Sequence, residues 1–161
     1  MMRRPAQILF LTLATLLGGA TLLRAADQAE SVEKLKQRAE AATGGTRARL
    51  FVEVARLEIE EANQHFTDGD VDKAHARVKD AVTDAEKGAD AARISGKRLK
   101  DTEIDLRKLQ RRTEDIRRSL ALEDRPALQS MVERLEALRQ QLLDKMFGHD
   151  NKNKSKAAPP S

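Results

Sequence analysis

The chain has 161 residues, with 30 Lys and Arg against 26 Asp and Glu and a formal net charge of +4. It contains no cysteine, which excludes disulfide bonds, thiolate metal sites, thiol catalysis and the lipid anchor of a bacterial lipoprotein. Aromatic residues make up only 2% of the chain and charged residues 35%. This composition disfavours an enclosed ligand pocket or a surface that stacks nucleic-acid bases, and it is typical of thin packing between amphipathic helices.

The N-terminal region has the three parts of a secretory signal peptide. Arg3 and Arg4 form a basic start, residues 8–23 are mostly apolar, and a cleavage site follows Ala25. Because the apolar run is short for a membrane-spanning helix and is broken by threonines and glycines, we expect cleavage in preference to a retained anchor. The sequence therefore predicts export, to a bacterial periplasm or out of the cell.

The excess of positive charge comes from the two ends of the chain. Three arginines lie in residues 1–25, and three lysines and one aspartate lie in residues 148–161, so the segment between them holds 24 basic and 25 acidic residues. A nearly neutral body does not indicate nucleic-acid binding. Residues 148–161 have no hydrophobic period and few apolar side chains, and they are predicted to form a disordered, basic tail.

Two helices are expected in the N-terminal half of the mature chain. Apolar residues recur at helical spacing over 27–42, and the run Thr43-Gly44-Gly45 then predicts a break. Thr46 can cap the next helix, which is expected over 46–66. The apolar stripe of this second helix is wide in its first half, which predicts contact with two neighbouring helices.

A third segment, over 70–121, keeps helical periodicity without a proline. Gly88 and Gly96 each weaken a helix by about 1 kcal/mol relative to alanine. We expect one continuous helix of roughly 75 Å, at a rise of about 1.5 Å per residue, or a helix bent near residues 95–96. A straight helix would give a slender rod, and a bent one would give a compact four-helix bundle.

From Leu99 the apolar spacing changes to a heptad, and the heptad resumes after a break at Asp124 and Pro126. Asp124 can cap a new helix over 126–147, with Pro126 in its first turn. Two heptad segments joined by a short loop predict an antiparallel, coiled-coil-like hairpin. Its buried positions are expected to include Leu109, Ile116, Leu135 and Leu138.

The predicted fold class is therefore all-α. The helical domain would cover residues 26–147 as an elongated antiparallel bundle of three to four helices, or as a helical rod, with the coiled-coil-like hairpin at its C-terminal end. Both arrangements contain the same two helical hairpins.

The turn within residues 65–78 places three aspartates and two histidines close together in the sequence. An EF-hand loop beginning at Asp68 would need a glycine and a bidentate carboxylate at the positions of Lys73 and Lys79. Because cations stand at both positions, the sequence excludes this calcium-binding motif.

The same turn fits the end of one helix and the start of the next. Gly69 can take the left-handed conformation that ends a helix, and Asp70 can cap the helix that follows. A zinc or copper site formed by His65, His75 and Asp68 stays open as an alternative. Such a site needs three ligands that converge in space, and sequence spacing alone does not show convergence.

The stretch GDVDKAHARVKDAV resembles the second helix of a tetratricopeptide repeat together with the turn before it. The small positions of the family are matched by Ala62, Gly69, Ala74 and Ala81. The departures are Glu58, Glu61 and His65 at large apolar positions and Glu86 at the closing proline. The resemblance covers about residues 58–86, without a second copy at the family's 34-residue period. It implies a close-packed helical pair and not a peptide-binding superhelix.

The sequence contains no nucleophile elbow, glycine-rich phosphate loop or HExxH motif. Paired carboxylates such as Glu60 and Glu61 are interpreted as solvated helix surface, because a catalytic acid needs a shaped, partly dry site. Met131 and Met146 lie on or beside the leucine seam and are interpreted as core residues and not as haem ligands. We therefore expect a protein that is not an enzyme and that needs no cofactor.

Charge is segregated along the helical region, with acids concentrated in residues 58–90 and bases in residues 97–118. One interpretation is a solvated surface with intrahelical ion pairs. The other is an electrostatic interaction face that meets an acidic partner, an anionic lipid surface or another copy of the chain. The candidate face consists of Arg98, Arg107, Lys108, Arg111, Arg112, Arg117 and Arg118.

These observations favour an exported helical structural or interaction protein of the cell envelope, which binds a protein partner or associates with itself. The first alternative is a periplasmic metal-binding helical protein that uses His65 and His75. The second is a peripheral membrane-surface protein that uses the basic segment 97–118 and the lysine-rich tail.

Overall fold

The computed structural model describes the backbone of residues 32–156 and the side chains of residues 32–148. Within this part of the chain there are five helices and no strand, which confirms the all-α class. The helices cover 32–41, Gly44–Asp68 (α2), Val71–Ser95 (α3), Leu99–Ser119 (α4) and Arg125–Lys156 (α5). The predicted signal peptide, the first residues of the expected helix over 27–42 and the end of the predicted tail lie outside the described residues.

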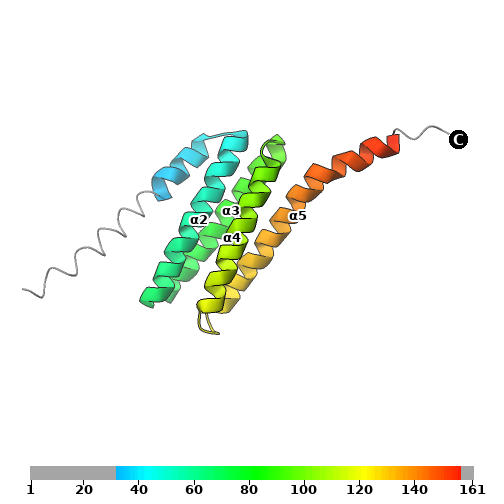
Figure 1. The fold of residues 1–161 in the computed structure, drawn as a ribbon. Helices are drawn as coiled ribbons and strands as arrows, with labels where there is room; N and C mark the ends of the chain where they lie inside the picture. The colour runs from blue at the N-terminus through cyan, green and yellow to red at the C-terminus, as the bar shows by residue number, and fades with distance from the viewer. Residues whose placement is uncertain (1–31, 157–161) are drawn as a thin grey trace, which may run out of the picture.

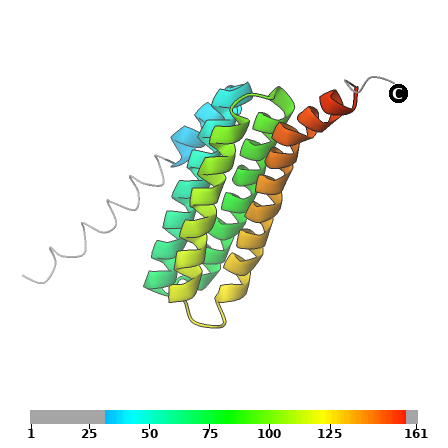
Figure 2. The ribbon, with the colours of Figure 1, turned by 45° about the vertical axis from the view of Figure 1, so that its right-hand side comes forward.

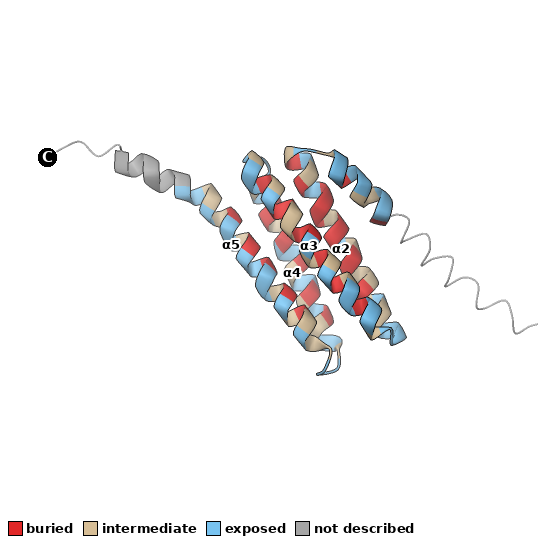
Figure 3. Cartoon of the chain, turned by 180° about the vertical axis from the view of Figure 1, so that it is seen from behind, coloured by how far each residue is buried: buried red, intermediate tan, exposed pale blue. Residues whose placement is uncertain are grey.

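Figures 1 and 2 show α2, α3, α4 and α5 side by side, each running opposite to the helix before it. The most extensive packing is between α2 and α3, followed by that between α4 and α5, and α3 also packs on α5. The helix over 32–41 covers α2 through a separate small cluster in which Ala39 contacts Leu50 and Phe51. Figure 3 shows that buried residues line the facing sides of the helices while the outer sides are exposed. None of the described helices has both the length and the apolarity needed to cross a membrane.

Small residues allow α2 and α3 to approach closely. Their interface is formed largely by buried alanines such as Ala48, Ala55, Ala81 and Ala85. A Cβ atom added to Gly88 would lie 2.8 Å from Cγ2 of Val52 and 3.1 Å from the carbonyl oxygen of Ala48. Real Cβ atoms are essentially never found as close to another heavy atom as 2.8 Å. Glycine at position 88 therefore lowers helix propensity but allows the two helices to pack closely.

Of the two expectations for residues 70–121, the structure agrees with the break near residues 95–96 and not with one continuous helix. α3 ends at Ser95, and Gly96 has a φ of 66° and donates its N–H to the Ala92 carbonyl at 2.9 Å. Arg98 also has a positive φ, of 58°, before α4 begins at Leu99. A glycine in the left-handed conformation ends the helix without a proline, and the chain then reverses its direction.

The expected cap of the second helix also differs from the structure. α2 begins at Gly44, with Thr43 as the N-cap residue, so Thr46 lies inside the first turn. A Cβ atom added to Gly45 would lie 2.9 Å from Cγ of Arg98. The two glycines thus allow the start of α2 to pass closely beneath the loop between α3 and α4.

The predicted core positions in the C-terminal pair are confirmed. Leu109, Ile116, Leu135 and Leu138 are all buried, and α4 packs on α5. Thr113, a polar residue in the predicted seam, is also buried and donates its hydroxyl to the Leu109 carbonyl at 2.9 Å. This bond removes the cost that an unpaired buried hydroxyl would impose.

α5 is longer than the sequence predicts. It extends to Lys156, whereas the sequence predicts a disordered tail from residue 148. Gly148 does not have a positive φ, and the next proline is Pro159. No residue therefore interrupts the helix, and beyond the buried Leu142 it continues past the ends of its neighbours (Figures 1 and 2).

Candidate functional site

Two carboxyl groups lie inside the interface of α2 and α3. Glu58 and Asp84 are both fully buried. Lys36 reaches them from the helix over 32–41, with its Nζ 2.7 Å from Oδ2 of Asp84 and 3.4 Å from Oε1 of Glu58. Lys87 Nζ lies 3.2 Å from Oδ1 of Asp84 and 3.0 Å from Oε1 of Glu40. Charged groups therefore hold the first helix onto the α2–α3 pair.

The electrostatics of this buried cluster favour the protonated form of Glu58. Burial, with the negative charge of Asp84 adding to it, raises the pKa of Glu58 to about 8, although Lys36 opposes the shift. Burial lowers the pKa of Lys36, but its contacts with Asp84 and Glu58 outweigh this and leave the pKa raised. Oε2 of Glu58 has no hydrogen-bond partner among the described residues. A perturbed carboxyl can mark a catalytic site, but here it is closed beneath the first helix and holds that helix in place.

The candidate metal ligands point to different partners. Nδ1 of His65 lies 3.8 Å from Oδ2 of Asp70, and the ring of His75 makes an edge contact with Phe66 at a centroid distance of 5.6 Å. Asp68 accepts a hydrogen bond from the amide of Gln64 at 3.0 Å. Among the residues that the structure describes, no group of three or more His, Cys, Asp or Glu side chains is arranged to hold a metal ion.

The turn itself has the geometry of a helix end. Gly69 has a φ of 80°, and the N–H of Asp70 donates to the His65 carbonyl at 2.9 Å. Asp70 occupies the N-cap position of α3, but its side chain makes no capping bond. It pairs instead with Lys73, at 2.8 Å.

Six of the seven basic residues of the candidate interaction face have acidic partners. Five of them pair with acidic residues of α4, and Arg112 reaches across to Glu60 of α2. The side chain of Arg111 makes no hydrogen bond or ion pair with any described residue. Most of the basic charge in 97–118 is thus balanced locally, and of the seven only Arg111 keeps a guanidinium group without a partner in the described part of the chain.

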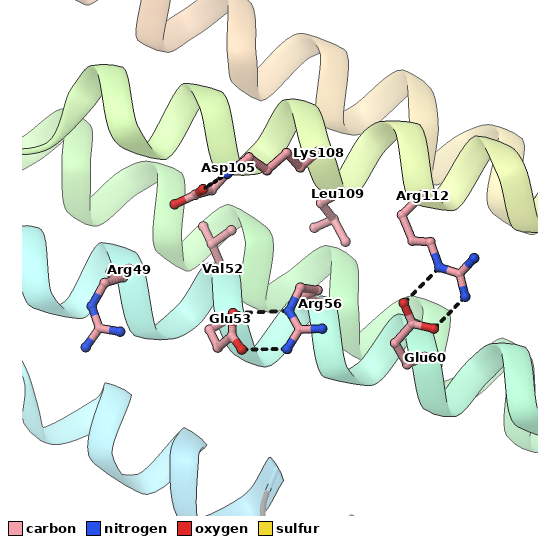
Figure 4. A pocket seen from close by; sticks show the side chains of 9 residues that line it. All are labelled: Arg49, Val52, Glu53, Arg56, Glu60, Asp105, Lys108, Leu109 and Arg112. Carbon is pink, nitrogen blue, oxygen red and sulfur yellow. Dashed lines mark hydrogen bonds and ion pairs between the residues drawn. The ribbon is translucent and has the colours of Figure 1, made fainter.

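A surface groove of about 440 Å³ runs between α2 and α4 (Figure 4). Val52 and Leu109 give it an apolar floor, and three ion pairs line its sides. The lining residues are Arg49, Val52, Glu53, Arg56, Glu60, Asp105, Lys108, Leu109 and Arg112. The groove therefore has two charged rims, with two almost fully buried apolar side chains at its base.

The three ion pairs of the α2–α4 groove differ in geometry. Arg56 donates two hydrogen bonds to Glu53, at 2.6 and 3.2 Å, and Arg112 donates two to Glu60, at 2.7 and 2.8 Å. These bonds lower the pKa of each glutamate, so both remain ionised near neutral pH. The third pair joins Lys108 to Asp105 at 3.3 Å. Arg49 has no acidic partner within ion-pair distance among the described residues.

Sequence reasoning identified the α4 side of the groove and missed the α2 side. Lys108 and Arg112 belong to the predicted basic face, whereas Arg49, Glu53 and Arg56 were assigned no role. A signal was present, because these three residues follow one another at intervals of three and four and so share one side of a helix. The geometry of the turn at Gly96 decides which side of α4 faces these three residues, and the sequence does not specify that geometry.

No protein-family model, curated protein or solved structure matches this chain. The resemblance of residues 58–86 to a tetratricopeptide hairpin therefore remains a prediction.

Proposed function

We propose that this chain is an exported, non-catalytic helical interaction protein of the cell envelope, and that it acts as a compact four-helix bundle. It binds a protein partner, or a second copy of itself, through the α2–α4 groove. The observation that carries the proposal is the groove between α2 and α4, in which ion pairs line both sides and the almost fully buried Val52 and Leu109 form the base. A helical segment of a partner can lie in a groove of this kind, with its charged side chains against the two rims.

The ion pairs of the two rims can be replaced by contacts with a binding partner at a small cost in free energy. The side chains of Arg56, Glu53, Arg112 and Glu60 are all between 39% and 48% exposed. Ion pairs of this kind contribute only about 0–1 kcal/mol, so charged groups of a partner can replace one member of a pair. Arg49 adds a positive charge without an ion-pair partner at the rim, which favours an acidic residue on the partner.

The metal-binding alternative has less support. His65, His75 and Asp68 each contact a different neighbour, and no convergent set of ligands exists within residues 32–148. The expectation of export rests on the basic start, the apolar run and the cleavage site at Ala25.

Affinity purification from the native envelope tests the proposal. The double variant Arg49→Glu/Lys108→Glu reverses two exposed charges on opposite sides of the groove. We expect it to recover at least about tenfold less of a partner that co-purifies with the parent, because the rims would then repel an acidic segment.

The matched control is Arg38→Glu/Lys79→Glu, which reverses one arginine and one lysine at exposed positions outside the groove, the first in the helix over 32–41 and the second in α3. Recovery of the partner should be the same as with the parent. Equal recovery with the groove variant and the parent would exclude the groove as the binding surface. Thermal melts of both variants check that each remains folded.

A further inference from the structure

A second cleft, between α4 and α5, has a lining dominated by arginine. It has a volume of about 430 Å³ and is lined by Arg107, Gln110, Arg111, Glu114, Val132 and Arg139. Arg107, Arg111 and Glu114 follow at intervals of four and three on α4, so they share one side of the helix. Lys108 and Arg112 of the α2–α4 groove lie on a different side of α4. The two surfaces are therefore separate.

The carboxylates around this cleft are already occupied. Glu103 is buried and accepts hydrogen bonds from Arg107 at 2.7 Å and from Arg139 at 2.9 Å. Burial acts to raise the pKa of Glu103, but these two arginines outweigh it and hold the pKa below the ordinary value. Glu114 accepts from Arg117 at 2.7 Å and Arg118 at 3.0 Å, which lowers its pKa to about 2. Each glutamate thus stays ionised and is shared by two guanidinium groups.

The side-chain groups of Arg111 and Gln110 that make no hydrogen bond within the described part of the chain are hydrogen-bond donors. Arg111 has no partner in the described part of the chain, so its five N–H groups are available to a ligand. The side-chain oxygen of Gln110 accepts from Arg139 at 2.6 Å, which fixes the amide so that its NH₂ group remains a donor. Five arginines and three glutamates meet around the cleft, including Glu136 beside Arg139, and leave an excess of positive charge.

Glu103 also orders the arginines. It holds Arg107 and Arg139, which come from different helices, in fixed positions beside Arg111. Holding the guanidinium groups in place lowers the entropy lost when a ligand binds, and a planar guanidinium fits two oxygens of a phosphate. The cleft is thus prepared for an anion with several acceptor oxygens.

We propose that the α4–α5 cleft binds a phosphate group, with Arg111 as the principal ligand and Arg107 and Gln110 as supporting donors. The phosphate belongs either to a soluble phosphorylated molecule or to the headgroup of an anionic lipid, since both present the same oxyanion. This site does not depend on the proposed protein-binding function, because it lies on another side of α4.

Titration of the full exported chain with inorganic phosphate, followed by calorimetry or by NMR shifts, tests the site. We expect saturable one-to-one binding that weakens as salt is added. Arg111→Gln should weaken binding about tenfold, the loss typical of one charge-assisted hydrogen bond.

Two control variants accompany this titration. Arg38→Gln makes the same substitution at an exposed position of the helix over 32–41, outside the cleft, and should leave binding unchanged. The groove variant Arg49→Glu/Lys108→Glu should also still bind phosphate, so failure of the groove proposal would not affect this result.

Flotation with vesicles distinguishes the two sources. Binding to phosphatidylglycerol vesicles but not to phosphatidylcholine vesicles, lost in Arg111→Gln and kept in Arg38→Gln, would assign the site to a lipid headgroup. Saturable binding of free phosphate with the same pattern of variants, and no flotation, would assign it to a soluble ligand. The proposal is overturned if neither probe binds, or if Arg111→Gln and Arg38→Gln have equal effects on both.

Discussion

Lys36 bridges two carboxyl groups that lie inside the protein. Its contact with Asp84 is short, at 2.7 Å, and its contact with Glu58 is longer, at 3.4 Å. Two buried negative charges beside each other would be costly even though Lys36 and Lys87 both contact Asp84, because only Lys36 also reaches Glu58. A protonated Glu58 agrees with its full burial, with the neighbouring carboxyl group of Asp84 and with its raised pKa.

This arrangement predicts a stability that falls with rising pH. The folded-state pKa of Glu58, about 8, lies above its ordinary value of 4.5. The stabilisation from the protonated form is therefore complete below pH 4.5 and is lost as the pH rises through about 8. The carboxyls with lowered pKa values, such as Glu103 and Glu114, affect stability only as the pH falls below 4.5. The raised pKa of Lys36 acts only above 10.5.

Urea unfolding of the parent and of Glu58→Gln at about pH 5 and about pH 9 measures this effect. The free energy of unfolding of the parent should be at least about 1 kcal/mol lower at about pH 9 than at about pH 5. The reason is that a shift of one pKa unit corresponds to about 1.4 kcal/mol. Glu58→Gln keeps the shape and cannot ionise, so most of that loss should disappear. If the parent and the variant have the same pH dependence, Glu58 is ionised throughout.

At the scale of the helices, the sequence predicts the buried positions of α4 and α5 but leaves open the turn between α3 and α4. The heptad spacing identified Leu109, Ile116, Leu135 and Leu138 as buried, because period alone assigns one side of a helix to the core. The sequence indicated residues 95–96 as the place of a possible bend but could not decide between a bend and a continuous helix, since a left-handed glycine in a long alanine-rich segment looks the same as a tolerated helical glycine. The change from an alanine stripe to a leucine heptad at Leu99 was the available signal.

The candidate sites were harder to predict than the elements. Glu58 and Asp84 stand on the apolar stripes of α2 and α3, but they face each other only once the two helices are paired. Arg139 meets Glu103 across 36 residues of sequence. Such contacts depend on the helix arrangement, which a single periodic pattern does not specify.

Gly88 provides a test of the α2–α3 packing. Alanine favours a helix over glycine by about 1 kcal/mol, yet Gly88→Ala should lower the free energy of unfolding by about 1–2 kcal/mol. The reason is that the new methyl group would overlap Val52 and the backbone of Ala48. Gly148→Ala is the control, because a Cβ atom there would meet nothing within 4 Å. In chemical denaturation, the stability of Gly148→Ala should match or exceed that of the parent. A stabilising effect of Gly88→Ala would instead mean that α2 and α3 are further apart than the structure shows.

At the scale of the whole molecule, an all-α protein with few aromatic residues depends on its aliphatic core. Leu135 is buried between α4 and α5, and its replacement by alanine should cost about 2–5 kcal/mol. Arg111→Ala, at an exposed position without a partner among the described residues, should cost well under about 1 kcal/mol. Thermal melts of the parent and both variants give these differences.

The same melts, repeated over a range of protein concentrations, test whether the core belongs to one chain. A midpoint that does not depend on concentration is expected for a self-contained bundle. A midpoint of the parent that climbs with concentration would show that the core is shared between chains.

The most direct test of the function is site-specific photocrosslinking in cells that produce the chain naturally. A photoreactive side chain in place of Arg49, on the rim of the α2–α4 groove, should form a discrete crosslink to a protein partner or to a second copy of the chain. The same group in place of Lys79, at an exposed position of α3 outside the groove, should form none. A crosslink from position 79 with none from position 49 would contradict the assignment of the groove as the binding surface.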